Sequence, residues 1–524
     1  MALTFQSTVS ANIATESGGG ITNLGALTVN KSTISGNTAA GFFGGGINSS
    51  GTLTLTNSTV SGNSAQYGGG IKNGSLGTMT LTGSIVEGNT ARSDGGILSF
   101  GALAVTNSTI SGNTVRYSGG GIGNDEGTVT LTDSSVEGNT ATYAGGVSNS
   151  SGRLTVTNST ISGNRATASG GGIGSSNCCG GSTVTLTNST VSGNTAGIAG
   201  GGVKNFDENG QTSITLTLSN STVSGNTAAD RGGAVDNSGT MTLTNSTVTA
   251  NASGRVAGGL FNTGAVTLVQ SLLSGNTAPV NGSEAYSVAG QSGQGTVIAD
   301  GFNVFGYDGS AGIAGFTPGA TDRVPGVPLS AILDPTLSYN GGATRTHSLV
   351  FGSPAVDAVL GAACATGADQ RGAPRAQDGD GDTFADCDSG AVERRLVPVQ
   401  AELAGTTLAC RGTTCGIPVR CNLTEAQCTN EVEVVVRTRA VRAADGTLAR
   451  AARRIRFATG VTNVPPGGTG QVTLRLTKQG KRLVRATTKK RLKGVLGIRK
   501  LTATVSNTPV TINNTLVTIR LRRR

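Results

Sequence analysis

The tripeptide Ser-Gly-Asn, or a close variant of it, returns at a nearly fixed spacing of 24–32 residues through the first half of the chain. Its asparagines are Asn12, Asn37, Asn63, Asn89, Asn113, Asn139, Asn164, Asn194, Asn226, Asn251 and Asn276. A repeat of this length indicates a solenoid, in which each unit covers the apolar face of the next. The repeat outweighs a composition of 84 glycines, no tryptophan and 3% aromatic residues, which alone would indicate disorder.

Apolar and polar residues alternate within each copy of the repeat. In the segment 52–56, Leu53 and Leu55 share one side and the threonines share the other, the period of two that indicates a β-strand. Apolar residues also recur at the positions of Val60 and Ile71. The sequence therefore predicts an all-β fold, a right-handed parallel β-helix of the pectate-lyase type, with about 11 coils over residues 1–283 and about 4.8 Å between coils.

Asparagine recurs at two positions of the repeat, those of Asn63 and Asn73. Asparagine tolerates turn backbone, and its side-chain amide bonds to an identical amide above or below it in a stack. We therefore predict two asparagine ladders along the β-helix.

Charge divides the chain into two parts. Residues 1–395 hold 15 Lys and Arg against 24 Asp and Glu, a net charge of −9, whereas residues 396–524 hold 24 against 5, a net charge of +19. Eight cysteines, four of them crowded together, suggest disulfides and an oxidising compartment. The crowded cysteines are Cys410, Cys415, Cys421 and Cys428.

These features predict a protein at the cell surface or outside the cell. The opening residues MALTFQSTVSAN lack the basic and apolar regions of a signal peptide and begin inside a coil, so we expect a truncated N-terminus. No apolar run approaches the length of a membrane span, and no transmembrane segment is expected.

The repeat resembles a known group of bacterial proteins. A run such as Gly-Gly-Gly-Ile at residues 68–71, followed by a strand and an asparagine turn, is similar to the repeats of polymorphic outer membrane proteins and related bacterial β-helix surface proteins. The resemblance covers residues 1 to about 283. It implies a β-helix displayed on a cell surface.

Residues 284–395 break the period, and we expect them to cap the β-helix, because an open end exposes unpaired backbone and core. Motifs in this range resemble the bacterial choice-of-anchor Q domain, which implies surface display rather than a reaction. It also favours a hydrogen-bonded, noncatalytic role for the only histidine. The motifs are Asn340–Gly342, Thr346–His347, Gly352–Asp357, Asp369–Gly372 and Cys387–Glu393.

The segment DGDGDTFADCD within this region predicts a Ca²⁺ site, because alternate carboxylates that converge supply the oxygen ligands that Ca²⁺ prefers. Thr383 stands where a calcium loop favours glycine, and Ser389 replaces the bidentate glutamate. The alternative is a solvated acidic turn clamped by a Cys364–Cys387 disulfide. The candidate ligands are Asp378, Asp380, Asp382, Asp386 and Asp388.

Residues 396–524 alternate like strands and predict a basic, immunoglobulin-like β-sandwich. A net charge of +19 suits an anionic polymer such as a cell-wall polysaccharide, or nucleic acid without sequence specificity. The alternative is an arginine-rich surface that reflects biased composition. The basic patch contains Lys478, Lys481, Arg482, Arg485, Lys489, Lys490 and Arg491.

An enzyme that acts on polysaccharides is one alternative for a β-helix. Such chemistry needs clustered carboxylates, or a metal site with a basic residue, in one groove. The repeats contain no histidine and few acidic residues, and we expect no stacked acidic cluster on one face. The sequence therefore favours a noncatalytic protein.

A second alternative is an ice-binding surface, because threonines recur on the outward side of the strands and resemble the flat Thr-x-Thr arrays of ice-binding solenoids. Threonine is also a common outward strand residue. The first rank is Thr28, Thr54, Thr80, Thr130, Thr155, Thr185, Thr217, Thr242 and Thr267.

The variable segment after each Ser-Gly-Asn-Thr-Ala run carries aromatic residues, which we expect to form one ridge. Aromatic rings on a ridge stack on sugars or on a partner protein. The sequence thus predicts an adhesin-like protein or structural stalk that binds cell-wall or host glycans or surface proteins. The ridge residues are Phe42, Tyr67, Tyr117 and Tyr143, with Phe43 beside them.

Overall fold

The computed structural model describes residues 7–177, 180–207, 214–290, 293–350, 352–360, 363–364, 367–379 and 385–394, together with Lys478 and the backbone of strands at 2–3 and between 399 and 522. Contacts divide the chain into two compact units, which are described separately. The first contains residues 1–359, 366–375 and 388–393, and the second contains residues 360–365, 376–387 and 394–524.

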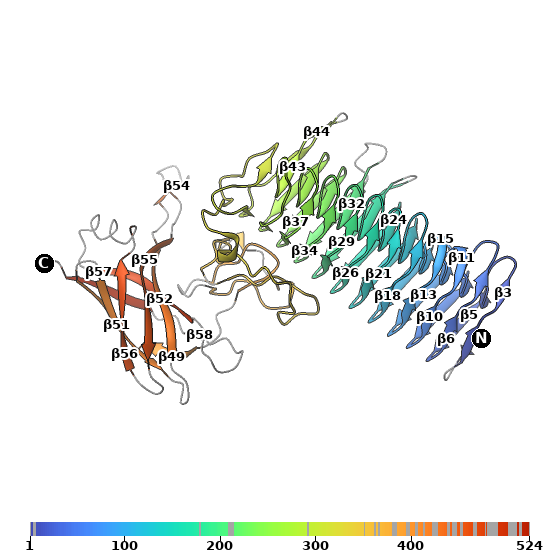
Figure 1. Cartoon of the computed structure of the whole chain (residues 1–524), viewed down its shortest axis with the longest axis horizontal. Helices are drawn as coiled ribbons and strands as arrows, with labels where there is room; N and C mark the ends of the chain where they lie inside the picture. Colours follow the sequence, from blue (N-terminus) through green and yellow to red (C-terminus); the bar gives the residue numbers. More distant parts are fainter. Residues whose placement is uncertain are drawn as a thin grey trace. The chain divides into compact units, whose positions relative to one another are not determined.

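The first unit is a β-helix of stacked coils, and most coils contribute one strand to each of four parallel sheets (Figure 1). Sheet A contains β1 (Ala2–Leu3), β5 (Ala26–Asn30), β9 (Thr52–Thr56), β13 (Thr78–Thr82), β17 (Ala102–Thr106), β21 (Thr128–Thr132), β25 (Arg153–Thr157), β29 (Ser182–Thr187), β33 (Ile214–Ser219), β37 (Thr240–Thr244), β41 (Ala265–Val269) and β46 (Thr296–Ile298). Sheet B contains β2 (Thr8–Ser10), β6 (Thr33–Ser35), β10 (Thr59–Ser61), β14 (Ile85–Glu87), β18 (Thr109–Ser111), β22 (Ser135–Glu137), β26 (Thr160–Ser162), β30 (Thr190–Ser192), β34 (Thr222–Ser224), β38 (Thr247–Thr249), β42 (Leu272–Leu273) and β47 (Val304–Phe305).

The other two sheets complete each coil. Sheet C contains β3 (Ile13–Ala14), β7 (Thr38–Ala39), β11 (Ser64–Tyr67), β15 (Thr90–Ser93), β19 (Thr114–Val115), β23 (Thr140–Ala141), β27 (Arg165–Ala166), β31 (Thr195–Ala196), β35 (Thr227–Ala228) and β39 (Ala252–Ser253). Sheet D contains β4 (Ile21–Asn23), β8 (Ile47–Ser49), β12 (Ile71–Asn73), β16 (Ile97–Ser99), β20 (Ile122–Asp125), β24 (Val147–Ser150), β28 (Ile173–Ser176), β32 (Val203–Phe206), β36 (Val235–Asn237), β40 (Leu260–Asn262), β43 (Ala285–Ser287) and β48 (Ile313–Ala314). A hairpin of β44 (Ala289–Gly290) and β45 (Gly293–Gln294) and a 3₁₀ turn, η1 (Leu329–Ala331), follow.

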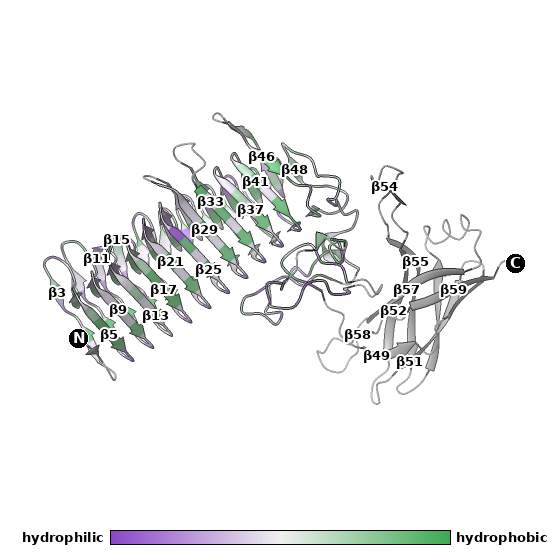
Figure 2. Cartoon of the chain, turned by 180° about the vertical axis from the view of Figure 1, so that it is seen from behind, coloured by the Kyte–Doolittle hydropathy of each residue, from purple (hydrophilic) through white to green (hydrophobic). Residues whose placement is uncertain are grey.

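The predicted aliphatic ranks form the core of the β-helix. Leu53, Leu55, Val60 and Ile71 are fully buried, and their counterparts in the other coils join them in one continuous cluster. Figure 2 shows hydrophobic strands recurring at the same place in successive coils. Burial of four aliphatic side chains contributes roughly 6–12 kcal/mol per coil before the conformational entropy is subtracted, so stacking stabilises what one coil cannot.

The first predicted asparagine ladder is present in the interior. The side-chain Nδ2 of Asn63 donates to Oδ1 of Asn89 over 3.0 Å and to the carbonyl of Ile34 over 3.0 Å. The Asn63 side chain is fully buried, and the same pattern repeats from coil to coil. In the second ladder serine replaces some of the amides, as at Ser49 and Ser99, but Asn205 still donates to Asn237 over 2.7 Å.

Glu284 closes the first ladder, because its carboxylate accepts hydrogen bonds from Nδ2 of Asn276 and from the backbone N–H of Gly275. Burial raises the pKa of Glu284 to about 7, although these hydrogen bonds act in the opposite direction. The folded chain therefore keeps this proton up to about pH 7, whereas the unfolded chain releases it near pH 4.5.

We predict that the free energy of unfolding falls as the pH rises from about 4.5 to about 7, because the unfolded state binds fewer protons there. Glu284→Gln lessens this slope, since the neutral amide keeps an oxygen acceptor for Asn276. Thermal unfolding of both proteins across this pH range measures the effect. Equal slopes for the two proteins contradict the role assigned to Glu284.

The coils extend past the predicted boundary at residue 283. Strands β43, β46, β47 and β48 continue sheets A, B and D although the Ser-Gly-Asn signature is lost. The alternation survives there, because Val297 and Ile313 still pack against the core and Phe305 is fully buried. The rings of Phe305 and Phe316 meet edge to face with centroids 6.0 Å apart, and both belong to the last packed layer of the core.

The rest of the predicted cap lies elsewhere. The described residues between 332 and 393 in the first unit, named here the lateral segment, lie along the outer face of sheet B over β30, β34 and β38. The hydroxyl of Thr190 donates to the carbonyl of Arg345 over 2.6 Å, and the hydroxyl of Thr222 donates to Oε1 of Gln370 over 2.6 Å. Outward-facing hydroxyl groups therefore hold the lateral segment against the side of the coils. The sequence analysis had placed this segment at the end of the β-helix as a cap.

The second unit contains a nine-stranded sheet with the order β50-β59-β57-β52-β55-β56-β51-β49-β58. Its strands are β49 (Val399–Leu403), β50 (Thr407–Arg411), β51 (Thr414–Cys421), β52 (Cys428–Arg437), β55 (Arg454–Val464), β56 (Thr469–Leu476), β57 (Arg491–Lys500), β58 (Thr511–Ile512) and β59 (Leu516–Arg522), and β53 (Val441–Arg442) pairs with β54 (Leu448–Arg450). The described strands make one sheet instead of the two separate sheets of the predicted sandwich. The strand β51 pairs with both β50 and β49 along one edge and with β56 along the other, which joins these strands in a single sheet.

Candidate functional site

The predicted aromatic ridge follows the turn between sheets C and D. Phe43 and Tyr67 pair as a parallel bridge between neighbouring coils, and their ring centroids are 5.7 Å apart. The backbone N–H of Tyr143 donates to the carbonyl of Tyr117 over 2.8 Å, which sets these residues on neighbouring coils. Phe42, Tyr117 and Tyr143 are 56%, 39% and 54% exposed. The structure therefore places the predicted ridge residues along one turn of the coils, as two pairs separated by the coil of Ser93, with Phe42 and Tyr117 one position before Tyr67 and Tyr143.

Basic side chains accompany the aromatic rings, a feature that the sequence analysis missed. The guanidinium carbons of Arg92 and Arg116 lie 5.1 Å and 5.4 Å from the ring centroid of Tyr117, and Lys72 lies 5.4 Å from that of Phe43. The hydrogen bond from Arg92, followed by the charges of Arg116 and Arg92, lowers the pKa of Tyr117. Arg92 and Arg116 occupy the same variable segment of the repeat as the tyrosines, and this shared position could have predicted their contact with the rings.

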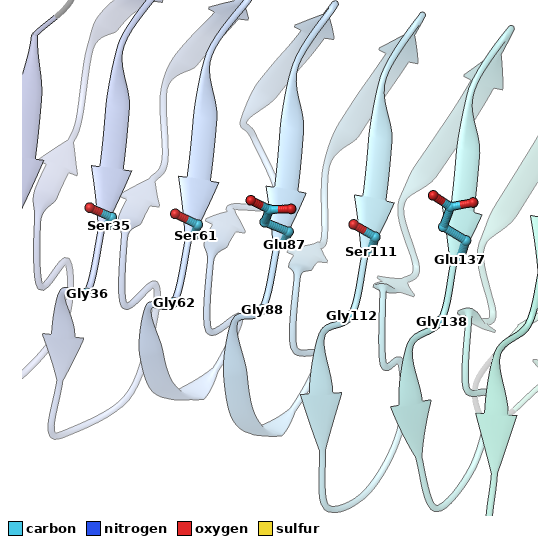
Figure 3. Close-up of a pocket in the computed structure, with 10 residues that line it drawn as sticks. All are labelled: Ser35, Gly36, Ser61, Gly62, Glu87, Gly88, Ser111, Gly112, Glu137 and Gly138. Carbon is cyan, nitrogen blue, oxygen red and sulfur yellow. The ribbon is translucent and has the colours of Figure 1, made fainter.

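A groove of about 800 Å³ runs along the end of sheet B in five successive coils (Figure 3). Its lining residues are Ser35, Gly36, Ser61, Gly62, Glu87, Gly88, Ser111, Gly112, Glu137 and Gly138. Gly62 has a φ of +61°, and a Cβ built there has its nearest neighbour 3.9 Å away. The glycine is therefore required by the backbone conformation of the turn rather than by packing, and its missing side chain leaves the groove open.

Glu87 and Glu137 stand two coils apart in this groove, with Ser111 between them (Figure 3). Both glutamates are exposed. Two coils correspond to about 9.6 Å along the axis at the spacing of neighbouring strands. The sequence analysis expected no stacked acidic cluster and did not foresee that these two glutamates share one face, with Ser111 between them. The sequence signal for this pair is the replacement of Ser-Gly-Asn by Glu-Gly-Asn in two copies of the repeat. The two glutamates come onto one face only when the coils are stacked.

The threonine rank is in register across sheet A. Thr54 pairs with Thr28 on one side and with Thr80 on the other, and Ala104 interrupts the rank before Thr130. Thr54, Thr80 and Thr130 are half-buried, Thr28 near the end of the sheet is exposed, and all face outward. The array has the regularity expected of an ice-binding face, and that function stays a hypothesis that a thermal-hysteresis measurement tests.

The acidic segment is described in part. Asp380 and Asp382 lie outside the described residues, and Asp386 is buried. Oδ1 of the fully buried Asp388 accepts a hydrogen bond of 2.7 Å from the backbone N–H of Asp357. Within the described ranges no three His, Cys, Asp or Glu side chains gather closely enough to hold a metal ion. The calcium site thus stays a prediction, whereas the Cys364–Cys387 disulfide of the alternative is present.

The remaining candidates are His347 and the basic patch. The ring nitrogens of His347 lie 2.7 Å from Oγ of Ser224 and 2.8 Å from the carbonyl of Asp334, so both are hydrogen-bonded as expected. Burial lowers the pKa of His347. In the basic patch Lys478 is exposed and Arg491 begins β57, and the other members lie outside the described residues.

Comparisons with known proteins bear on the fold. Residues 47–215 match the family model described as the right-handed beta helix region. No curated protein sequence matches the chain. In the described part of the chain, no helix is long and apolar enough to cross a membrane. The family match over residues 47–215 and the four sheets of stacked parallel strands together show a right-handed parallel β-helix of repeated coils in the first unit.

Proposed function

We propose that this chain is a noncatalytic, adhesin-like protein of the cell surface or the extracellular medium, and that it binds an anionic glycan along the aromatic ridge. The observation that carries the proposal is the pair of exposed rings of Tyr117 and Tyr143 on neighbouring coils, with the exposed ring of Phe42 further along the same turn. Exposed aromatic faces can stack on sugar rings. The resemblance of the repeats and of the choice-of-anchor Q motifs to bacterial surface proteins supports display outside the cell.

The charge of the ridge favours an anionic ligand. The cationic groups of Arg92 and Arg116 lie within 5.4 Å of the Tyr117 ring centroid, and that of Lys72 lies 5.4 Å from the Phe43 ring centroid. They therefore stand beside a sugar that the exposed rings of the ridge would bind. A carboxylate or sulfate on the sugar pairs with a guanidinium through charge-assisted hydrogen bonds. A neutral glycan cannot form these charge-assisted hydrogen bonds, and we therefore expect acidic glycans to bind more tightly.

Replacing both Tyr117 and Tyr143 by alanine is expected to weaken glycan binding by about tenfold or more, because exposed aromatic anchors dominate such interfaces. A glycan array, followed by titration of the best acidic ligand, measures the loss. Tyr339→Ala is the matched control, since Tyr339 is also exposed and also carries an arginine, Arg345, over its ring at 5.1 Å. Equal losses in both proteins, or no binding of acidic glycans to the original chain, would falsify the proposal.

A second candidate function, cleavage of a polysaccharide, is favoured by Glu87 and Glu137 in the open groove. The strands that carry them are about 9.6 Å apart at the usual strand spacing, just above the roughly 6.5–9.5 Å that separates the carboxyl groups of inverting glycosidases. Release of reducing ends from an acidic polysaccharide, abolished by Glu87→Gln and by Glu137→Gln separately, would establish this activity and displace the noncatalytic proposal.

A further inference from the structure

The lateral segment shows what the outer face of sheet B can bind. Nε2 of Gln370 donates to Oγ1 of Thr190 over 2.9 Å and lies 3.2 Å from the carbonyl of Ser189, while Oε1 accepts from Thr222 on the next coil. One glutamine side chain thus spans two coils through two threonine hydroxyls. All of these groups are buried.

The same face also binds the backbone of the lateral segment. Thr190 donates to the carbonyl of Arg345, and the backbone N–H of Ala391 donates to the hydroxyl of Thr247 over 2.9 Å. Leu272 stands at the equivalent position one coil further on, where it is fully buried in an apolar cluster with Ile332 of the lateral segment. Ranks of hydroxyl groups with an occasional aliphatic side chain therefore form a surface that binds polypeptide loops.

Sheet B has the same kind of binding surface in the earlier coils, which the lateral segment does not cover. The register of the sheet places Thr160 directly beside Thr190, and Thr109, Ser135 and Thr160 follow one another at this position. These three hydroxyl residues are half-buried instead of buried. Ile85, which is 39% exposed, is the counterpart of Leu272. The uncovered coils thus repeat both the hydroxyls and the apolar contact.

The uncovered half differs from the covered half in charge. Glu87 and Glu137 occupy the last position of their strands, where β34 and β38 have Ser224 and Thr249. Ser224 binds the ring of His347 and is fully covered, whereas both glutamates are exposed and line the groove. A partner that crosses these coils therefore meets two carboxylates about 9.6 Å apart at the spacing of neighbouring strands, and basic side chains complement them.

We propose that the outer face of sheet B from β6 to β26 is a docking site for a basic polypeptide segment of another protein. Glutamine or asparagine side chains of the partner bridge threonine hydroxyls of neighbouring coils, as Gln370 does, and lysine or arginine side chains pair with Glu87 and Glu137. The site is continuous with the part of sheet B that the lateral segment covers. It lies apart from the aromatic ridge, so it does not depend on glycan binding there.

A fluorescent peptide of alternating glutamine and lysine, twelve residues long, tests the site on the full chain by fluorescence anisotropy. We expect saturable binding that weakens with salt, because the exposed pairs are screened. A neutral peptide of alternating glutamine and serine should bind at least tenfold more weakly. Equal binding of the two peptides, or no binding of the lysine peptide, overturns the proposal.

Two pairs of variants locate the binding. The double change Glu87→Gln and Glu137→Gln should weaken the lysine peptide at least fivefold, while Glu16→Gln with Glu126→Gln, an equal loss of charge away from sheet B, leaves it unchanged. Thr109→Val with Thr160→Val should weaken binding about threefold or more, in contrast to Thr130→Val with Thr155→Val on sheet A. Equal effects within either pair overturn the assignment.

The same proteins distinguish other occupants of the face. Sedimentation velocity of the full chain reports self-association, and an oligomer that the Glu87→Gln and Glu137→Gln double variant dissociates would show that a second copy occupies the face. Competition with a neutral polysaccharide for the lysine peptide would show that a glycan occupies it. Either result overturns a basic polypeptide as the occupant.

Discussion

Alanine in place of Asn113 lowers the free energy of unfolding of the β-helix by about 2–4 kcal/mol, because it leaves several buried polar groups without partners. Oδ1 of Asn113 accepts from both the backbone N–H and Nδ2 of Asn89, at 2.9 Å and 3.0 Å. Its Nδ2 donates to the carbonyl of Val86 and to Oδ1 of Asn139. All three asparagines are fully buried, so water does not replace the lost bonds in the folded chain.

Thermal and denaturant unfolding measure this loss. Asn113→Asp adds a test of the direction of the ladder, since a carboxylate still accepts from Asn89 but has no N–H for Asn139 and places a charge in the core. We expect it to destabilise at least as much as alanine at neutral pH. Asn12→Ala is the control, because Asn12 is exposed and should change the transition little. A transition of Asn113→Ala that coincides with that of the original chain contradicts the ladder's role.

Alanine in place of Glu393 releases the lateral segment from sheet B, at a cost of about 3–5 kcal/mol, the usual effect of removing one partner of a buried ion pair. Oε2 of Glu393 lies 3.3 Å from Nη1 of Arg375, and the two side chains are 0% and 1% exposed. The same oxygen accepts from the backbone N–H of Asp388. Without the carboxylate, the guanidinium of Arg375 is left buried without its anionic partner, although it still donates to the carbonyl of Gly390 and to Oδ1 of Asn220.

Hydrogen exchange resolves this effect, because it reports each segment separately. Faster exchange is expected in the lateral segment of Glu393→Ala, and unchanged exchange is expected in the early strands of sheet A, which the segment does not touch. Glu393→Gln keeps an oxygen acceptor for Asp388 and should exchange at an intermediate rate. Protection of the lateral segment equal to that of the original chain would show that the Arg375–Glu393 pair does not hold it in place.

The repeat predicted most of the β-helix correctly because the features that define a coil are local. The alternation of Leu53 and Leu55 with threonine specifies a strand with one buried side, and the constant spacing specifies that the next coil offers the same residues. Identical asparagines at a constant spacing predict a ladder for the same reason. The aromatic ridge could be predicted too, since its residues share one variable segment of the repeat.

The segments outside the repeat could not be placed in this way. Nothing in the period shows that Gln370 reaches Thr190, 180 residues earlier in the chain, because that contact depends on shape and on hydroxyls that every coil presents equally. The boundary at residue 283 was set too early for a related reason. The last coil keeps its buried side chains, such as Phe305, without the tripeptide that marked the others.

The sequence by itself determined that the chain winds into stacked parallel coils with an aliphatic interior and amide ladders, since a repeated local pattern has only one way to bury itself. Only the tertiary structure decided which surface residues become neighbours. Glu87 and Glu137 are 50 positions apart and share a groove, and the lateral segment covers one half of sheet B and leaves the other open. Such neighbours arise from the stacking of coils and from contacts between distant segments, which depend on three-dimensional packing rather than on the periodicity of the chain.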